Sequence, residues 1–311
     1  MKYCTICGKR KAFYYHRISG NYVCDKCLRR IIIKNIKKAF GLYKLIAEIR
    51  PEIVYVIDPC YPLASITGLS LFSLAEKGFT EKISLAVPEE AKLDIKEIKN
   101  YSYLNVDKIY FTDYSIVDTL DPAERVRGIK ALIVKSRELN GADNSRIYVA
   151  LPYTRDHIVF FMLRSMLAPK PHLVPDYMPR HVDSSGKTIF IMPFYEVALE
   201  DLAAYSIIAK SYELARRIMK ACKMRRDVYE EEMLRKIVYS RGSELIYSSY
   251  KTLSYFAEGV AANPHLAKCR LCRGYEYKSV LEANDGYCRT CKTIVKGRGA
   301  NLSYEALTHN F

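Results

Sequence analysis

The stretch from Ile53 to Ala75 constrains the fold of this chain most. Ile53 to Ile57 is a continuous apolar run, which is typical of a parallel strand covered on both faces. Five residues, Asp58 to Pro62, interrupt the run, and residues 63–75 continue as an apolar segment long enough for a helix. In an open α/β sheet, ligands bind at such strand-to-helix corners. The first place to look for a site is therefore this corner.

The corner lacks the residues that hold a phosphate group. A phosphate-binding corner needs glycines, because its backbone N–H groups must approach the anion closely. Here there is no glycine, two prolines lack the N–H donor, and Tyr61 adds bulk. The first lysine after the strand is Lys77, at the far end of the helix. We expect the corner to be occupied by its own side chains, which argues against an ordinary nucleotide site.

Strand-like runs alternate with helical segments after the corner. Four more such runs follow the first: Lys82–Val87, Lys108–Thr112, Arg146–Leu151 and Thr188–Met192. Asp121 is a good N-cap, and Pro122 a good first residue, for a helix over residues 122–139. Five strands that alternate with helices predict an α/β fold with a doubly wound parallel sheet.

Eight of the ten cysteines form Cys-x-x-Cys pairs. The pairs are Cys4 with Cys7, Cys24 with Cys27, Cys269 with Cys272, and Cys288 with Cys291. The first two pairs are separated by 16 residues and the last two by 15, so each set can hold one tetrahedral ion. We predict two structural zinc ions, because four protein ligands leave no open position. Reduced, unliganded thiols are the alternative. His16 lies between the first pairs, but four cysteines make an imidazole ligand unnecessary.

Two cysteines remain outside these pairs, Cys60 and Cys222. The N-terminus has no signal-peptide layout and no 18-residue apolar run is present, so we expect a cytoplasmic protein with no membrane partner. In that compartment free or buried thiols are the favoured interpretation of both residues, and a bond between them is the weaker one.

The net charge of +15 favours a polyanionic partner such as RNA. Cations cluster in a basic amphipathic helix expected over residues 28–49 and again in residues 216–226. The candidate RNA-binding side chains are Arg30, Lys34, Lys37, Lys38, Arg216, Arg217, Lys220, Lys223, Arg225 and Arg226. Ordinary solvated faces are the alternative. The absence of glutamine and the abundance of lysine, glutamate and isoleucine resemble a hyperthermophile composition.

The N-terminal segment resembles that of the tRNA wobble-uridine thiolases. The resemblance rests on Cys4 to Cys27, with Gly8-Lys9-Arg10-Lys11-Ala12 between the pairs, then a basic helix and a buried strand. Residues 192–195, Met-Pro-Phe-Tyr, and the helical segment expected over residues 198–217 resemble the close of that family's α/β domain. These enzymes belong to the PP-loop ATP pyrophosphatase superfamily, whose members adenylate a tRNA base and replace its oxygen with sulfur.

The family's phosphate loop and cluster ligands do not match this chain. Its Ser-Gly-Gly-Lys-Asp-Ser loop falls on residues 58–63, where no position agrees. Glu124 and Arg127 stand where related enzymes have two cysteines of an iron–sulfur cluster, and Cys222 stands at the third cluster position. Of the family's Gly-His-Asn-x-Asp-Asp only Asp156 remains, which we interpret as a structural or capping carboxylate. We therefore predict no catalytic residue, no bound ATP and no iron–sulfur cluster.

The resemblance implies a degenerate, non-catalytic paralogue, similar to the loop-deficient subunit of the eukaryotic cytosolic tRNA thiolase. Its expected partners are tRNA and an active thiolase, in a heterodimer, or a second copy of itself. Two alternatives stay open: an enzyme with a diverged site that uses Cys60, and an RNA-binding or assembly protein outside thiolation.

The chain is expected to divide into five parts. These are a zinc module in residues 1–33, the α/β domain in 34–240, a connecting helix in 241–262, a zinc ribbon in 263–296 and a loose tail in 297–311.

Overall fold

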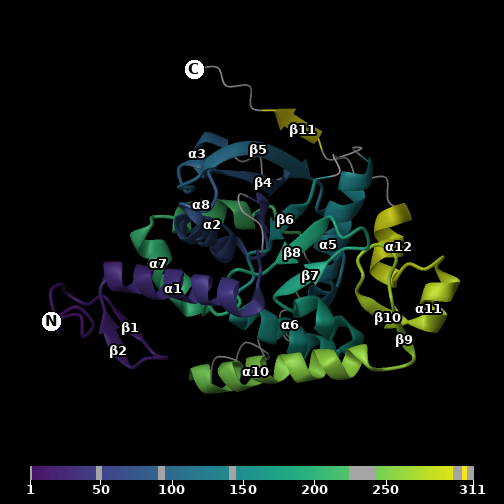
Figure 1. Cartoon of the computed structure of the whole chain (residues 1–311). Coiled ribbons are helices and arrows are strands. Elements are labelled where there is room, and N and C mark those ends of the chain that lie inside the picture. Colours follow the sequence, from purple (N-terminus) through teal and green to yellow (C-terminus); the bar gives the residue numbers. More distant parts are fainter. Residues whose placement is uncertain are drawn as a thin grey trace.

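The computed structural model describes residues 2–46, 51–89, 95–139, 145–223, 242–296 and 303–306. A seven-stranded sheet forms its centre, in the order β11-β5-β4-β3-β6-β8-β7 (Figure 1). Five strands are parallel: β3 (Glu52–Val56), β4 (Lys82–Pro88), β5 (Asn105–Thr112), β6 (Ile147–Ala150) and β8 (Thr188–Ile191). They are the five runs predicted from the sequence, so the doubly wound parallel sheet is confirmed.

Two short antiparallel strands complete the edges of the sheet. β7 (Arg180–Val182) pairs with β8, and β11 (Ser303–Ala306) pairs with β5. The expectation of a loose tail after Lys296 is therefore wrong for these four residues. An uncovered edge strand presents a row of backbone donors and acceptors that a short segment can pair with, whatever its own strand propensity.

Helices cover both faces of the sheet. One layer holds α1 (Asp25–Tyr43), α2 (Pro62–Glu76), α7 (Leu199–Ile208) and α8 (Tyr212–Met219), and the other holds α5 (Pro122–Leu139), α6 (Arg155–Leu167), the 3-10 helix η2 (Pro171–Tyr177) and α10 (Gly242–Ala261). Two short helices, α3 (Ile95–Lys99) and α4 (Ser115–Asp118), flank β5. Along β3, Ile53 and Tyr55 face the layer that holds α1 and α2, whereas Val54 and Val56 face the layer that holds α5 and α6. This alternation explains the continuous apolar run.

The central helix α2 packs closely on β3. A Cβ atom at Gly68 would lie 2.6 Å from the Tyr55 hydroxyl and 2.9 Å from the Phe194 ring. Only glycine fits at this contact, so the helix that starts at the corner is held tightly against the strand that leads into it.

The helix expected over residues 198–217 is instead two helices, α7 and α8. Lys210 between them has a φ of 52°, in the left-handed region that ends helices. The neighbouring Ser211 is buried, and its hydroxyl lies 2.8 Å from that of Thr67 in α2. The break turns α8 onto α2. Residues 224–241, which include the end of the α/β domain expected over residues 34–240, lie outside the described residues.

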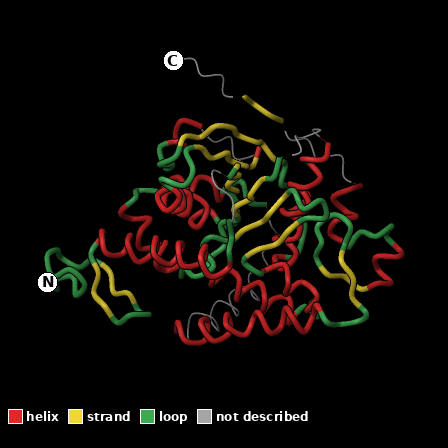
Figure 2. Tube along the Cα trace, in the orientation of Figure 1, coloured by secondary structure: helices red, strands yellow, loops and turns green. Residues whose placement is uncertain are grey.

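Two small modules flank the sheet. Before α1 stands a hairpin of β1 (Tyr14–His16) and β2 (Asn21–Val23), and after α10 come β9 (Leu266–Lys268), β10 (Tyr275–Tyr277), α11 (Lys278–Ala283) and α12 (Arg289–Lys296). Figure 2 shows the two modules at opposite ends of the molecule, the first as short strands and loops and the second as short strands, loops and short helices.

Within the described ranges, no helix has the length and apolar composition needed to cross a membrane.

Candidate functional site

The sheet order reverses between β3 and β6, so the carboxyl ends of these two strands form the topological switch point. This is the position at which doubly wound sheets bind ligands. Asp58 follows β3 and Tyr153 follows β6. Both side chains are fully buried.

A buried ion pair fills the centre of this corner. Arg125 of α5 donates from Nε and Nη2 to the Asp58 carboxylate, with donor–acceptor distances of 3.0 and 2.8 Å. The third nitrogen, Nη1, donates to Oδ1 of Asp118 at 2.7 Å. Arg125 and Asp58 are both 0 % exposed. One guanidinium therefore joins α5 to the segments that follow β3 and β5.

Further hydrogen bonds complete the network. The Tyr153 hydroxyl donates to Oδ2 of Asp58 at 2.7 Å, and the backbone N–H of Lys223 donates to Oδ2 of Asp118 at 3.0 Å. Burial alone would lower the pKa of Arg125, but the charges of Asp58 and Asp118 hold that pKa well above its usual value. Burial and the Asp58 charge likewise raise the pKa of Tyr153. These protonation states are locked, which suits a structural network.

Cys60 and Cys222 form a disulfide at the edge of this network. Their Cα atoms are 5.0 Å apart, and the Cys60 N–H donates to Oδ1 of Asp58 at 2.9 Å. The favoured expectation of two free or buried thiols is therefore wrong. The residues are 162 positions apart, and the fold brings α8 back over the corner, which sequence spacing does not reveal.

Aromatic rings occupy the remaining space. The Tyr61 ring lies 5.5 Å from that of Tyr153, 4.7 Å from that of His157 and 5.5 Å from that of Phe161, all edge to face. The expectation that the corner is filled by its own side chains is confirmed. Its polar groups satisfy one another, and the bulky rings stand where a ligand would need space.

Glu124, Arg127 and Asp156, which are compared above with site residues of the tRNA thiolases, all have structural partners. Glu124 accepts from Nζ of Lys170 at 3.0 Å, and Arg127 donates from Nε to Asp176 at 2.6 Å. Asp156 accepts the N–H of Leu199 at 2.7 Å, at the first residue of α7. The expectation of a capping role for Asp156 is therefore confirmed, on the neighbouring helix rather than its own.

Each set of four cysteines converges on one point. In each group the four sulfur atoms lie within 4.8 Å of one another, and Cys7–Cys24 and Cys272–Cys288 are both separated by 3.8 Å. A tetrahedral ion with metal–sulfur bonds of about 2.3 Å needs sulfur atoms about 3.8 Å apart, so both groups fit a metal ion. His16 instead faces Asp201, with 3.3 Å between Nε2 and Oδ2.

The C-terminal cysteine group is built into the second layer of the fold. Backbone N–H groups of Gly274 and Cys291 donate to cysteine sulfur atoms, as expected around metal-bound thiolates. Arg127 of α5 donates to the carbonyl of Tyr275 at 2.9 Å. A Cβ atom at Gly274 would lie 2.8 Å from Nε of Arg127. Arg127 stands at a position where the related enzymes have a cysteine of the iron–sulfur cluster. Here it instead holds the C-terminal module against α5.

The predicted RNA-binding cations lie on two helices that pack on the same helix, α2. On α1, Arg30, Lys34, Lys37 and Lys38 are exposed, and Lys38 pairs with Glu196 at 3.0 Å. On α8 and the residues after it, Arg216, Arg217, Lys220 and Lys223 are exposed, and Arg217 pairs with Glu97. Arg225 and Arg226 lie outside the described residues. The structure thus places most of the set on one layer of the molecule.

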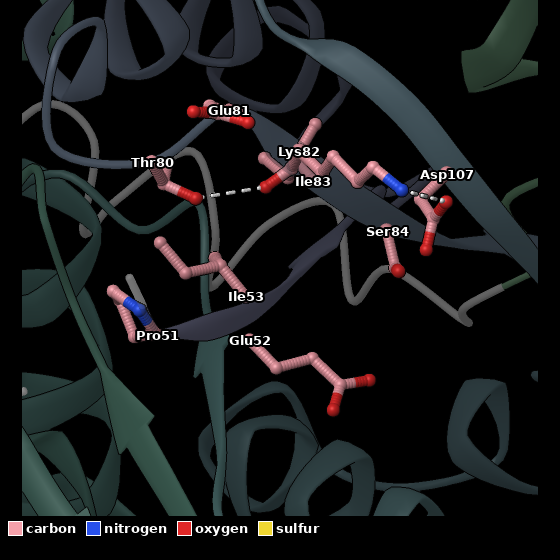
Figure 3. A pocket seen from close by; sticks show the side chains of 9 residues that line it. All are labelled: Pro51, Glu52, Ile53, Thr80, Glu81, Lys82, Ile83, Ser84 and Asp107. Atoms are coloured by element: carbon pink, nitrogen blue, oxygen red, sulfur yellow. Dashed lines mark hydrogen bonds and ion pairs between the residues drawn. The ribbon is translucent and has the colours of Figure 1, made fainter. Parts of the chain in front are cut away.

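A cavity of about 250 Å³ lies at the amino ends of β3 and β4, whereas the corner lies at the carboxyl ends of the strands (Figure 3). Glu52, Thr80 and Ser84 help to line it, and Lys82 pairs with Asp107 at 3.3 Å. Doubly wound sheets bind ligands at the carboxyl ends of their strands. This cavity is therefore no part of the corner site.

Comparison of the sequence with protein-family models finds no match, and comparison with curated proteins finds none. Among solved structures, the chain is similar to the U34-tRNA thiolase NcsA from Methanococcus maripaludis, a structure described with its 4Fe–4S cluster. The TM-score is 0.55 at 15 % sequence identity, over 93 % of this chain and 94 % of that chain. Over nearly its whole length, the chain has the α/β fold of this tRNA thiolase.

Proposed function

We propose that this chain is a non-catalytic, tRNA-binding partner of a tRNA wobble-uridine thiolation enzyme. The observation that carries the proposal is the Asp58–Arg125 pair at the switch point of a thiolase-like fold. A phosphate group there would need open N–H donors and an unpaired cation. The corner instead presents a carboxylate whose partner guanidinium is already bound on three nitrogens.

Metal chemistry in this proposal is structural. The eight paired cysteines are assigned to two zinc ions, since four thiolate ligands leave no position for a substrate. A tetrahedral set of four thiolates also suits iron, so the metal content needs direct measurement.

The basic layer formed by α1 and α8 is the proposed tRNA surface. Lys34 and Lys220 are exposed, and no ion pair holds either of them within the described part of the chain. Cations of this kind contact phosphates, so binding should be salt-dependent and tolerant of sequence.

Charge reversal tests the surface. In the double variant Lys34→Glu with Lys220→Glu, we expect tRNA affinity to fall at least ten-fold and the slope of log K against log salt to become shallower by about 2. The matched control reverses Lys251 and Lys278, exposed cations on α10 and α11, and should leave both quantities unchanged. Equal loss in both variants would mean that general charge, and not this surface, binds tRNA.

The link to thiolation needs a separate measurement. Mass spectrometry of tRNA nucleosides from a strain that lacks this gene should show loss of 2-thiouridine derivatives. Pull-down with the purified chain should retain an active thiolase. Unchanged thiolation, together with no bound thiolase, would exclude the partner role even if the chain binds tRNA.

The alternative of a Cys60-dependent enzyme is weakened by the disulfide. Cys60 is 5 % exposed and bonded to Cys222, so its sulfur is not a thiolate nucleophile in this state.

A further inference from the structure

The hairpin of the N-terminal module has two chemically different faces. On β1, Tyr14 and His16 point to the body of the protein, where the Tyr14 hydroxyl donates to Oδ1 of Asp201 at 3.0 Å and His16 pairs with the same carboxylate. Val23, directly across from Tyr14, is fully buried. Side chains alternate along a strand, so the residues between these ones point away from the body.

The outward face is aromatic. Tyr15 lies directly across from Tyr22, with ring centroids 5.0 Å apart. Phe13, two positions before Tyr15, belongs to the same face. Phe13 is 46 % exposed and Tyr15 is 47 % exposed. Rings this exposed contribute little to the core, and we call this set of Phe13, Tyr15 and Tyr22 the aromatic face.

The segment that carries the aromatic face is strongly basic. Residues 2–23 contain five lysines and arginines and no aspartate or glutamate. Nζ of Lys2 lies 3.9 Å from the centre of the Tyr22 ring, and Arg17 pairs with Glu200 of the body at 3.8 Å. Within the described residues, the exposed Lys9, Arg10 and Lys11 have no carboxylate partner. The module therefore offers flat apolar rings inside a positive field.

We propose that the aromatic face binds unpaired nucleotides of an RNA, with bases stacked on Phe13 and Tyr15 and phosphates beside the cations. Bases splayed out of a helix stack on exposed aromatic side chains, whereas double-stranded RNA buries its bases. The charge favours this occupant over a protein, since a second copy of this module would bring the same cations against it. The proposal deepens the proposed function by adding a single-strand site on a different element from α8.

The test measures binding of a fluorescein-labelled ten-nucleotide single-stranded oligoribonucleotide to the purified chain. Replacing Tyr15 with alanine removes one stacking ring, and we expect the Kd to rise about five- to thirty-fold. Phe13→Ala should have a similar effect, and Tyr15→Phe, which keeps the ring, should bind as the wild type does. Tyr255→Ala on α10 removes a ring that is 74 % exposed elsewhere and should change nothing.

Three outcomes overturn the proposal. One is an unchanged Kd in both alanine variants. Another is an equal loss of affinity for a double-stranded RNA of the same length, because such a loss would indicate a general effect of the substitution. The last is a change of oligomeric state: the wild type sediments as a dimer, and Tyr15→Ala sediments as a monomer that still binds RNA. That result would make the aromatic face an interface between copies of the chain.

The same measurements separate this inference from the proposed function. If the oligonucleotide binds through Tyr15 but tRNA thiolation does not depend on the protein, the aromatic face stands and the thiolation role fails. If tRNA binding depends on Lys34 and Lys220 and is indifferent to Phe13 and Tyr15, only the aromatic face fails.

Discussion

Arg125 binds Asp58 through two guanidinium nitrogens at the carboxyl end of β3, with both side chains fully buried. A charge pair at this depth is costly to form, because both ions leave water. Its geometry offsets that cost: Asp58 also accepts from Tyr153 and from the Cys60 N–H, and Arg125 also binds Asp118. The corner is thus a structural joint between strands and helices of both layers.

Removing the guanidinium should destabilise the fold strongly. In Arg125→Ala, Asp58 and Asp118 remain buried without their cation, so we expect the free energy of unfolding to fall by about 3 to 5 kcal/mol. Urea unfolding followed by circular dichroism measures this. The double variant Asp58→Asn with Arg125→Met should recover part of the loss, because it leaves fewer unpaired charges. A loss below about 1 kcal/mol in Arg125→Ala would show that the pair does not hold the corner.

The disulfide should contribute to stability under oxidising conditions. Cys60 and Cys222 close a loop of 162 residues, which restricts the unfolded chain. We expect Cys222→Ser to lose about 2 to 4 kcal/mol, and a dithiol reductant to lower the thermal midpoint of the wild type. The reductant should have no such effect on Cys222→Ser. Non-reducing peptide mapping should recover the Cys60 and Cys222 peptides joined, and finding them separate would exclude the bond.

The architecture was predictable because the sequence of β3 itself indicates a strand that is buried on both faces. Its apolar run reflects burial on both faces, and such runs recur at each parallel strand. The edge strands carry no such signal: β7 has three residues and β11 has four, and their pairing depends on the edges that β8 and β5 present. No local pattern could have predicted them.

The corner was predictable in part. Missing glycines and two prolines indicated that side chains would occupy it, but the partner of Asp58 was not identified. A signal for Arg125 existed, because it shares a helical stripe with Ile129 and Leu132, both fully buried. A cation on an apolar stripe indicates a buried partner. The Cys60–Cys222 bond had no comparable signal, since it depends on the turn between α7 and α8.

The two cysteine groups should each bind one metal ion. Elemental analysis of the purified protein should give two zinc ions per chain, one in Cys272→Ser, and two in a Cys60→Ser with Cys222→Ser control. The N-terminal ion should be lost first to a chelator, because Cys7 is partly exposed whereas all four C-terminal cysteines are buried. Iron with acid-labile sulfide at either site would contradict the zinc assignment.

Glu76, the last residue of α2, should make stability depend on pH. Burial raises the pKa of this carboxyl from 4.5 to about 7, against a smaller lowering by Lys37. The folded state therefore holds the proton more tightly than the unfolded state, so stability should fall as pH rises from about 4.5 to 7 and stay low above that. Glu76→Gln removes the ionisation, and we expect a gain of about 1 to 3 kcal/mol at pH 8 and little change at pH 4. The control is Glu81→Gln, at an exposed position nearby. Urea unfolding at both pH values measures the difference, and an equal effect of Glu76→Gln at pH 4 and pH 8 would rule out ionisation of this buried carboxyl as the cause.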